Sequence, residues 1–293
     1  MQLTIENLSK RYANGVQALN NVSLSIPAGM FGLLGPNGAG KSTLMRTLAT
    51  LQEADSGRAT LDGVDVLRDK DAVRRVLGYL PQEFGLYPKV SAIEMLEHFA
   101  VLKGVGPLRR RREIVELLLK KTNLFDVRFA RLGTFSGGMK QRFGIAQALL
   151  GDPKLIIVDE PTAGLDPEER VRFHNLLSEI GEHIVVILST HIVGDVSDLC
   201  RQMAVIHKGE VVLHGEPLKL AEALRDRIWR KFIAKEELSQ YQERHQVIST
   251  RRLAGRTLIH VDADARPDPS FEPVEPDLED VYFRAIRGHE AAA

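Results

Sequence analysis

The sequence predicts an α/β fold in which buried parallel strands alternate with helices. Short apolar and β-branched runs at 22–26, 30–34, 154–159 and 183–190 each lie next to a segment of helical character. A glycine-rich loop separates one of these runs from a helix-prone stretch. After about residue 215 the pattern changes to short strands and a proline-rich connection. These observations predict an α/β core followed by a small α+β unit.

Composition restricts the classes of protein to consider. The chain has 293 residues, of which 44% are hydrophobic and 27% charged, the balance of a globular protein with a core. Lys+Arg and Asp+Glu both number 39, and this neutrality argues against a nucleic-acid binder, which normally carries a basic excess. The single cysteine, Cys200, excludes an internal disulfide. No apolar run approaches the ~20 residues of a membrane helix, so we expect any membrane role to come through a partner.

A helical insert interrupts the predicted α/β core. Segments 91–104 and 107–124 both place apolar residues three and four positions apart, which is typical of amphipathic helices. Ser91 and Pro107 are residues that often begin a helix. We therefore expect a mostly helical subdomain at about 88–150.

The last part of the chain is predicted to be a separate small domain. It contains three short runs with strand character, a proline-rich connection at 265–277 and a final helix at 278–286. The sequence therefore predicts two domains, comprising residues 1–215 and 216–293.

A complete phosphate-loop pattern, G-x-x-x-x-G-K-[ST], occupies residues 35–42. It follows a predicted strand and precedes a predicted helix, the context that the pattern requires. Its glycines let backbone N–H groups surround phosphates at the positive end of the helix. Lys41 is expected to bridge the β- and γ-phosphates, and the Ser42 hydroxyl to ligate Mg²⁺. The residues expected to bind the nucleotide here are Gly35, Pro36, Asn37, Gly38, Ala39, Gly40, Lys41, Ser42 and Thr43.

Polar residues at the ends of other predicted strands supply candidate catalytic groups. Asp159 and Glu160 end the run "LIIVDEP". We expect Asp159 to hold Mg²⁺ through water and Glu160 to orient or deprotonate the attacking water. Gln82 is expected to reach the metal and the water, and His191 to contact the γ-phosphate and to hold Glu160 in place. The alternative for Asp159 and Glu160 is a pair of acids that cap a helix or face solvent. The alternative for His191 is an ordinary surface or core histidine.

A second glycine-bearing stretch, "FSGGM" at 135–139, precedes another helix-prone segment. Taken alone, Ser136 is either a helix N-cap or part of an anion-binding site. Both interpretations hold together, because a capped helix start is itself a site for anions.

Taken in order, the phosphate loop, Gln82, "FSGGMKQR", "LIIVDEPTAGLD" and "STH" resemble the ATP-binding cassette (ABC) family over residues 1–215. The resemblance implies a P-loop NTPase core with a β-rich N-terminal subdomain and a helical signature subdomain. It also implies an ATP hydrolase that uses ATP and Mg²⁺, in which Tyr12 stacks on adenine. The family signature is usually L-S-G-G-Q, and here Phe135 and Met139 replace its ends.

The resemblance also gives a reason for two phosphate-binding stretches. In this family two ATPase domains pair head to tail, and each nucleotide lies between one chain's phosphate loop and the other chain's signature. Ser136, Gly137 and Gly138 are therefore expected to serve the partner's ATP, and Asp166 to belong to the loop that crosses the dimer interface.

Several features favour a transporter motor within this family. The chain lacks the long coiled coils of the DNA-repair type and the second cassette of the translation type. We therefore expect separate membrane-spanning subunits and a peripheral position on the cytoplasmic face of the cell (inner) membrane. The segment after 215, which ends in "PDLEDVYFRAI", resembles the C-terminal extension of bacterial drug-resistance and polysaccharide- or antibiotic-exporter ATPases, so export is favoured over import. This extension is expected to be an accessory or dimerisation domain.

Two other functions remain as alternatives. One is a soluble ABC-type ATPase that acts on nucleic acid or ribosomes. The other is a P-loop kinase, which would leave the "FSGGM" stretch without a role.

Overall fold

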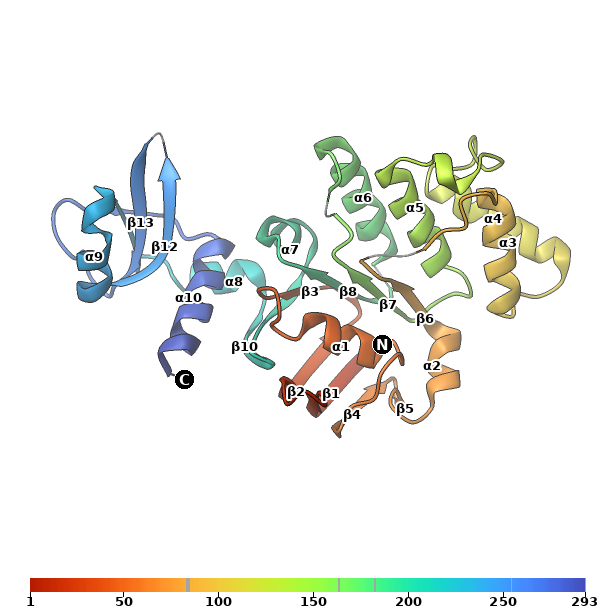
Figure 1. Ribbon diagram of the computed structural model, residues 1–293, viewed down its shortest axis with the longest axis horizontal. Helices are drawn as coiled ribbons and strands as arrows, with labels where there is room; N and C mark the ends of the chain where they lie inside the picture. Colours follow the sequence, from red (N-terminus) through yellow and green to blue (C-terminus); the bar gives the residue numbers. More distant parts are fainter. Residues whose placement is uncertain (83–84, 163, 182, 254, 293) are drawn as a thin grey trace.

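The computed structural model describes residues 1–82, 85–162, 164–181, 183–253 and 255–292. These residues form three β-sheets flanked by helices. Figure 1 shows the sheets of the first part of the chain on one side of the molecule and the C-terminal sheet, near α9, on the other.

The first sheet is antiparallel and has the strand order β2-β1-β4-β5. It contains β1 (Gln2–Arg11), β2 (Gln17–Pro27), β4 (Ser56–Leu61) and β5 (Val64–Asp65). The prediction that run 22–26 belongs to the parallel core is wrong, because this run lies in β2 and pairs antiparallel with β1. Burial alternates along β2, as expected for a strand with one solvent-facing side.

The central sheet has the order β10-β9-β3-β8-β7-β6 and confirms the predicted α/β core. All its neighbouring strands are parallel except the β9–β10 pair. Strands β7 and β8 are buried along their whole length, as strands covered on both faces must be. The strands are β3 (Gly29–Leu34), β6 (Leu77–Leu80), β7 (Leu155–Asp159), β8 (Val185–Thr190), β9 (Gln202–His207) and β10 (Glu210–Gly215).

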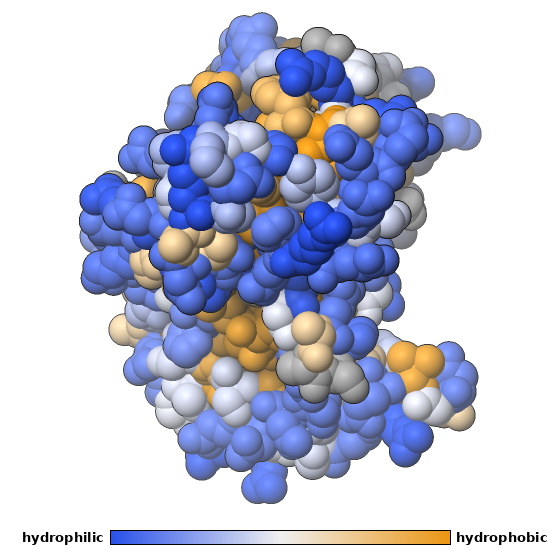
Figure 2. All heavy atoms as spheres, turned by 90° about the vertical axis from the view of Figure 1, so that its left-hand side faces the viewer, coloured by the Kyte–Doolittle hydropathy of each residue, from blue (hydrophilic) through white to orange (hydrophobic). Residues whose placement is uncertain are grey.

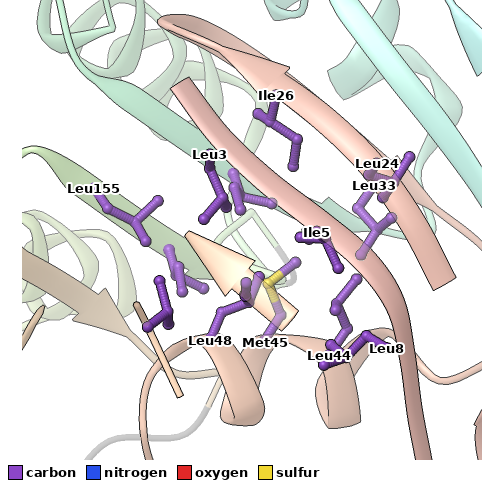
Figure 3. Close-up of a cluster of buried hydrophobic side chains, with 14 of the residues drawn as sticks. Leu3, Ile5, Leu8, Leu24, Ile26, Leu33, Leu44, Met45, Leu48 and Leu155 are labelled. Carbon is purple, nitrogen blue, oxygen red and sulfur yellow. The ribbon is translucent and has the colours of Figure 1, made fainter. Parts of the chain in front are cut away.

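Helix α1 (Lys41–Leu48) packs between the two sheets and fixes the loop that precedes it. Figure 3 shows Leu44, Met45 and Leu48 of α1 pointing into a cluster with Leu3 and Leu155, residues of β1 and β7. All these side chains are at most 2% exposed. The phosphate loop is therefore attached to a helix that apolar contacts hold from both sides.

Three helices of the insert share a separate apolar core. They are α3 (Ala92–Leu102), α4 (Leu108–Lys121) and α5 (Gly137–Ala148). Ser91 caps α3 as predicted, and its side chain and that of Glu94 satisfy each other's backbone N–H groups. Pro107 immediately precedes α4. Figure 1 shows these helices beside the edge of the central sheet formed by β6.

The remaining helices of the first part are α2 (Lys70–Val76), α6 (Pro167–Ile180) and α7 (Val193–Leu199). Helix α7 packs closely on β3 at Gly32, where a Cβ atom would lie only 2.6 Å from Val196 Cγ1. Figure 1 shows α6 and α7 on the side of the central sheet opposite α1.

The C-terminal part contains a third sheet with the order β12-β13-β11-β14. Four of its apolar residues, Ile228, Ile248, Leu278 and Val281, belong to the same buried cluster as Met30 of the central sheet. Figure 2, which views this end of the molecule, shows a mostly hydrophilic face with apolar residues in its hollows. The elements are α8 (Pro217–Glu222), β11 (Ile228–Ile233), α9 (Leu238–Arg244), β12 (Gln246–Leu253), β13 (Arg256–Asp262), β14 (Glu272–Pro273) and α10 (Leu278–Ala292).

In the part of the chain that the structure describes, no helix combines the length and the apolar character that crossing a bilayer requires.

Candidate functional site

A cavity of about 470 Å³ opens where the phosphate loop meets the ends of the central strands. It brings together residues far apart in the sequence, because the carboxyl ends of parallel strands meet at one edge of a sheet. The residues that line it are Tyr12, Val16, Ala18, Pro36, Asn37, Gly38, Ala39, Gly40, Lys41, Ser42, Thr43, Gln82, Glu160 and His191.

The backbone of the phosphate loop has the curvature that its glycines permit. Gly38 and Gly40 have φ angles of 78° and 110°, in the left-handed region that favours glycine. Gly40 also lies so close to its surroundings that a Cβ atom would stand 2.4 Å from the carbonyl oxygen of Ala18. The first turn of α1 contains no acidic residue. The loop therefore presents N–H groups and a positive helix end, which suits phosphate.

Lys41 brings a buried positive charge to this loop. Its Nζ donates hydrogen bonds to the carbonyl oxygens of Gly35 at 2.6 Å and Pro36 at 3.2 Å. Burial lowers the pKa of Lys41, whereas the carboxylates of Glu160 and Asp159 raise it. An anion bound in the loop would likewise favour the charged lysine.

Oxygen-bearing side chains beside the loop fit a magnesium ion. Asp159 ends β7 with a buried carboxylate, and Ser42 is exposed at the start of α1. Burial raises the pKa of Asp159, and the negative charge of Glu160 adds to this rise. The hydroxyl groups of Ser189 and Ser42 and the positive charge of Lys41 lower the pKa in part. A dication would favour the charged carboxylate. Carboxylate, hydroxyl and amide oxygens are ligands that Mg²⁺ prefers, so these residues fit the predicted metal, with Gln82 as the amide.

Glu160 lies between Gln82 and His191, two of the other predicted catalytic residues. Gln82 Nε2 donates to one of its carboxylate oxygens at 3.2 Å, and His191 Nδ1 lies 3.2 Å from the other. Glu160 has a φ of 47°, unusual for a residue with a side chain. Its backbone N–H donates to the carbonyl of Ser189 at 2.9 Å. The turn after β7 thus directs the Glu160 carboxylate to the cavity instead of continuing the strand.

Tyr12 follows β1 and lines the same cavity. Its hydroxyl lies 3.1 Å from Thr43 Oγ1 and donates to Gln52 Oε1 at 3.2 Å. Tyr12 is 37% exposed, so part of the residue is accessible to a ligand. The stacking of Tyr12 on adenine stays a prediction.

The second glycine-bearing stretch lies outside this cavity. Ser136 caps α5, and its Oγ accepts a hydrogen bond from Met139 N at 3.2 Å. Ser136 and Gly137 are exposed, and none of the three signature residues lines the phosphate-loop cavity. A Cβ atom at Gly138 would stand 2.4 Å from Glu169 Oε2, whereas one at Gly137 would meet nothing within 4 Å. Packing therefore explains Gly138 but gives no reason for Gly137.

Asp166 is exposed at the start of α6, which it caps. Its Oδ1 accepts a hydrogen bond from Glu169 N at 2.8 Å. The contact between Asp166 and a partner chain stays a prediction.

Sequence reasoning missed several residues that support the site. Gln52 accepts a hydrogen bond from the hydroxyl of Tyr12, and the carbonyl of Ser189 accepts one from the backbone N–H of Glu160. Asp195 accepts hydrogen bonds from Thr162 and Thr190, which lie beside the strand ends that carry Glu160 and His191. Ser189 lies in the "STH" motif but had no role of its own assigned, and Gln52 and Asp195 belong to none of the motifs quoted above. The signal that could have found Asp195 is a carboxylate four residues after His191.

Comparisons with known proteins agree on one family. Residues 19–163 match the family model described as ABC transporter. The chain is 33% identical over 300 residues to the uncharacterized ABC transporter ATP-binding protein YxlF of Bacillus subtilis, covering 97% of this chain and 99% of that protein. It is 32% identical over 303 residues to the probable multidrug ABC transporter ATP-binding protein YbhF of Escherichia coli. That alignment covers 98% of this chain, which spans about half (52%) of the length of YbhF.

A solved structure of a related cassette agrees with this result. The dimeric ATP-binding cassette MJ0796, in a post-hydrolysis state bound to ADP and Pi, superposes with a TM-score of 0.67 at 28% identity. The match covers 73% of this chain and 98% of that one.

Proposed function

Because the chain belongs to the ABC transporter family of ATP-binding proteins, we propose that it is the motor subunit of an exporter whose membrane-spanning subunits are separate chains. It is an ATPase of the transporter type. The export direction, the membrane partners and the residue roles given below belong to the proposal.

The position of the Glu160 carboxylate is the main support for its proposed role as the general base. Its carboxylate lies at the phosphate-loop cavity with Gln82 on one oxygen and His191 on the other, each at 3.2 Å. A carboxylate held from both sides has a fixed direction, which a general base for water requires. Lys41 and the loop N–H groups would bind the phosphates, and Ser42, Asp159 and Gln82 would hold Mg²⁺, with Asp159 acting through water. The metal supplies charge neutralisation at the transferred phosphoryl group.

The signature residues are proposed to act on the partner's nucleotide. The exposure of Ser136 and the empty space at Gly137 support this role, since both are accessible and neither contributes to the cavity of its own chain. We propose a head-to-tail dimer in which Ser136, Gly137 and Gly138 complete the other subunit's site and Asp166 lies at the interface. The dimeric state of the MJ0796 structure supports a dimer of this chain.

The cellular setting is proposed from the family and from the charge of the chain. The formal net charge of +0 supports a protein partner over nucleic acid. We propose a position on the cytoplasmic face of the cell membrane, an ATPase domain at 1–215 and an accessory domain at 216–293. Export is favoured by the likeness to YbhF, whose name describes a multidrug transporter, and by the resemblance of the C-terminal segment to exporter extensions.

Inverted membrane vesicles from cells that express this chain test the direction of transport. ATP and a panel of fluorescent amphipathic drugs are added outside vesicles with the wild-type chain and vesicles with Glu160→Gln, because inversion turns the cytoplasmic face to the outer medium. An exporter concentrates at least one drug inside vesicles that carry the wild type and none inside those with the variant. ATP-driven uptake by right-side-out vesicles alone would instead indicate import. Retention of the purified chain on ribosomes or DNA, but not on solubilised membrane protein, would support the soluble alternative.

A further inference from the structure

A buried carboxylate outside the cavity joins several segments of the proposed catalytic machinery. Asp195 of α7 is 0% exposed. Its Oδ1 accepts a hydrogen bond from Arg170 Nε at 2.8 Å, forms an ion pair with Arg170 Nη2 at 2.6 Å, and lies 2.9 Å from His174 Nε2. Its Oδ2 accepts from Thr162 Oγ1 at 2.6 Å and from Thr190 Oγ1 at 3.2 Å. Both carboxylate oxygens are therefore occupied by side chains from three other segments.

Two of these contacts lie beside the catalytic residues. Thr162 is two residues after Glu160, and Thr190 directly precedes His191. The hydroxyl of Thr190 also accepts a hydrogen bond, at 3.0 Å, from the backbone N–H that follows His191. The backbone on both sides of His191 is thus tied, through one hydroxyl, to Asp195.

The other two contacts hold helix α6. Arg170 and His174 are four residues apart, so they lie on the same face of this helix. The helix begins at Pro167 and is capped by Asp166, the residue proposed to lie at the dimer interface. The start of α6 and both catalytic strand ends therefore share one anchor.

We propose that Asp195 is a positioning residue that holds Glu160, His191 and the start of α6 in one arrangement. This inference rests on the catalytic roles proposed above for Glu160 and His191. Asp195 does not line the phosphate-loop cavity, so it acts through its neighbours and not on the nucleotide. Reactions of this kind depend on the alignment of the reacting groups, and small displacements of a catalytic group cost large factors in rate.

The charge of Asp195 is supported by its surroundings. Burial by itself raises the pKa of the carboxyl, but hydrogen bonds from His174 and Thr162 and the nearby Arg170 guanidinium lower it below its ordinary value. The carboxylate is therefore charged at neutral pH. Replacing it with an amide removes an acceptor from donors that have little water around them.

The test compares Asp195→Asn with Asp198→Asn, a matched change of an exposed carboxylate on the same helix. Thr190→Val is a second, milder variant that removes only the hydroxyl linking Asp195 to the backbone around His191. His191→Ala and the double variant Asp195→Asn/His191→Ala complete the set. For each purified protein, kcat and KM are measured by phosphate release, ATP affinity by fluorescent-nucleotide titration, and folding by thermal unfolding.

We expect Asp195→Asn to lower kcat by roughly 10- to 100-fold while ATP affinity stays within about twofold, because the phosphate loop is untouched. Thr190→Val should lower kcat by a smaller factor. In the His191→Ala background, Asp195→Asn should add little, because residues that act through a common group are not additive. Asp198→Asn should behave as the wild type.

Three results would overturn the inference while leaving the proposed roles of Glu160 and His191 intact. The first is a wild-type kcat in Asp195→Asn or, if that variant does not fold, in Thr190→Val. The second is a loss of kcat that simply follows a loss of ATP affinity. The third is full multiplication of the two single effects in the double variant. A normal rate in His191→Ala would instead remove the proposed role of His191, and this inference with it. If kcat fell in His191→Ala but not in Asp195→Asn or Thr190→Val, the proposed function would stand and only the role of Asp195 would be removed.

Discussion

The two glycine-bearing stretches of this chain are built very differently. In the phosphate loop, Gly38 and Gly40 have left-handed φ angles, and Lys41 lies buried against loop carbonyls within a cavity of about 470 Å³. In the signature stretch, Ser136 and Gly137 are exposed at the start of α5 and line no part of that cavity. Gly137 has no left-handed φ, and a Cβ atom added to it would meet nothing within 4 Å.

The phosphate loop and the signature stretch differ in what each can do within one chain. The phosphate loop carries its own charge, curvature and walls, so it can hold a nucleotide by itself. The signature stretch offers a capped helix start and open space, which is half of a binding site. We therefore interpret it as the part that another subunit's nucleotide completes.

Replacing Glu160 should give the largest effect on turnover. Glu160→Gln keeps the hydrogen-bond geometry but removes the base, so hydrolysis should slow by at least ~10²-fold while ATP still binds. Removal of a negative charge near the γ-phosphate should also let ATP-bound dimers accumulate. Phosphate-release assays and size-exclusion chromatography with ATP measure the two effects. Near-normal turnover would remove Glu160 from its proposed role.

Substitutions in the phosphate loop and in the signature stretch should differ in their effect on ATP affinity. Lys41→Ala removes a charged contact to phosphate, and we expect a loss of ATP affinity of roughly 10- to 100-fold. Ser136→Arg should leave the affinity of the dilute monomer within about twofold, because the signature does not line its own cavity. Fluorescent-ATP titration at low protein concentration measures both. Equal weakening by the two variants would mean that the signature serves the nucleotide of its own chain.

The two signature glycines give the smallest and most local test. Gly137→Ala fills open space in a helix, so it should raise stability by about 0.4–1 kcal/mol and yet lower turnover by obstructing the partner's nucleotide. Gly138→Ala should lower both, because its Cβ would displace Glu169, which pairs with Arg142 at 3.5 Å. Thermal unfolding and phosphate release are measured on the same samples. If Gly137→Ala were more stable and fully active, no ligand would approach this glycine.

The sequence predicted those parts of the fold and the site that depend on local patterns. The phosphate loop, the capped start of α3 at Ser91 and the strand ends at Glu160 and His191 all lie in contiguous motifs. The run 22–26 was assigned to the wrong sheet, because partners of a strand are decided by contacts distant in sequence.

Long-range packing explains what the sequence could not reveal. Ile228 and Leu278 share a buried cluster with Met30, so the C-terminal part packs against the central sheet. No periodicity in either segment indicates this contact. The contacts of Asp195 are equally hard to predict from the sequence, since its partners come from three separate segments. The domain division at 215/216 stays a prediction.

Mixing two inactive variants tests most directly whether the two stretches act in trans. Lys41→Ala and Ser136→Arg homodimers each carry one defect in both sites and should be nearly inactive. In a mixed dimer, one site combines the intact loop of the Ser136→Arg chain with the intact signature of the Lys41→Ala chain.

Random pairing of equal amounts should therefore restore up to about a quarter of the wild-type ATPase rate, if the two sites work independently. If both sites must act together, the same mixture in a Glu160→Gln background should still trap one nucleotide per mixed dimer. The account predicts restored activity or this single trapped nucleotide. A mixture that neither hydrolyses nor traps ATP would contradict it and would reduce Ser136 to the cap of α5.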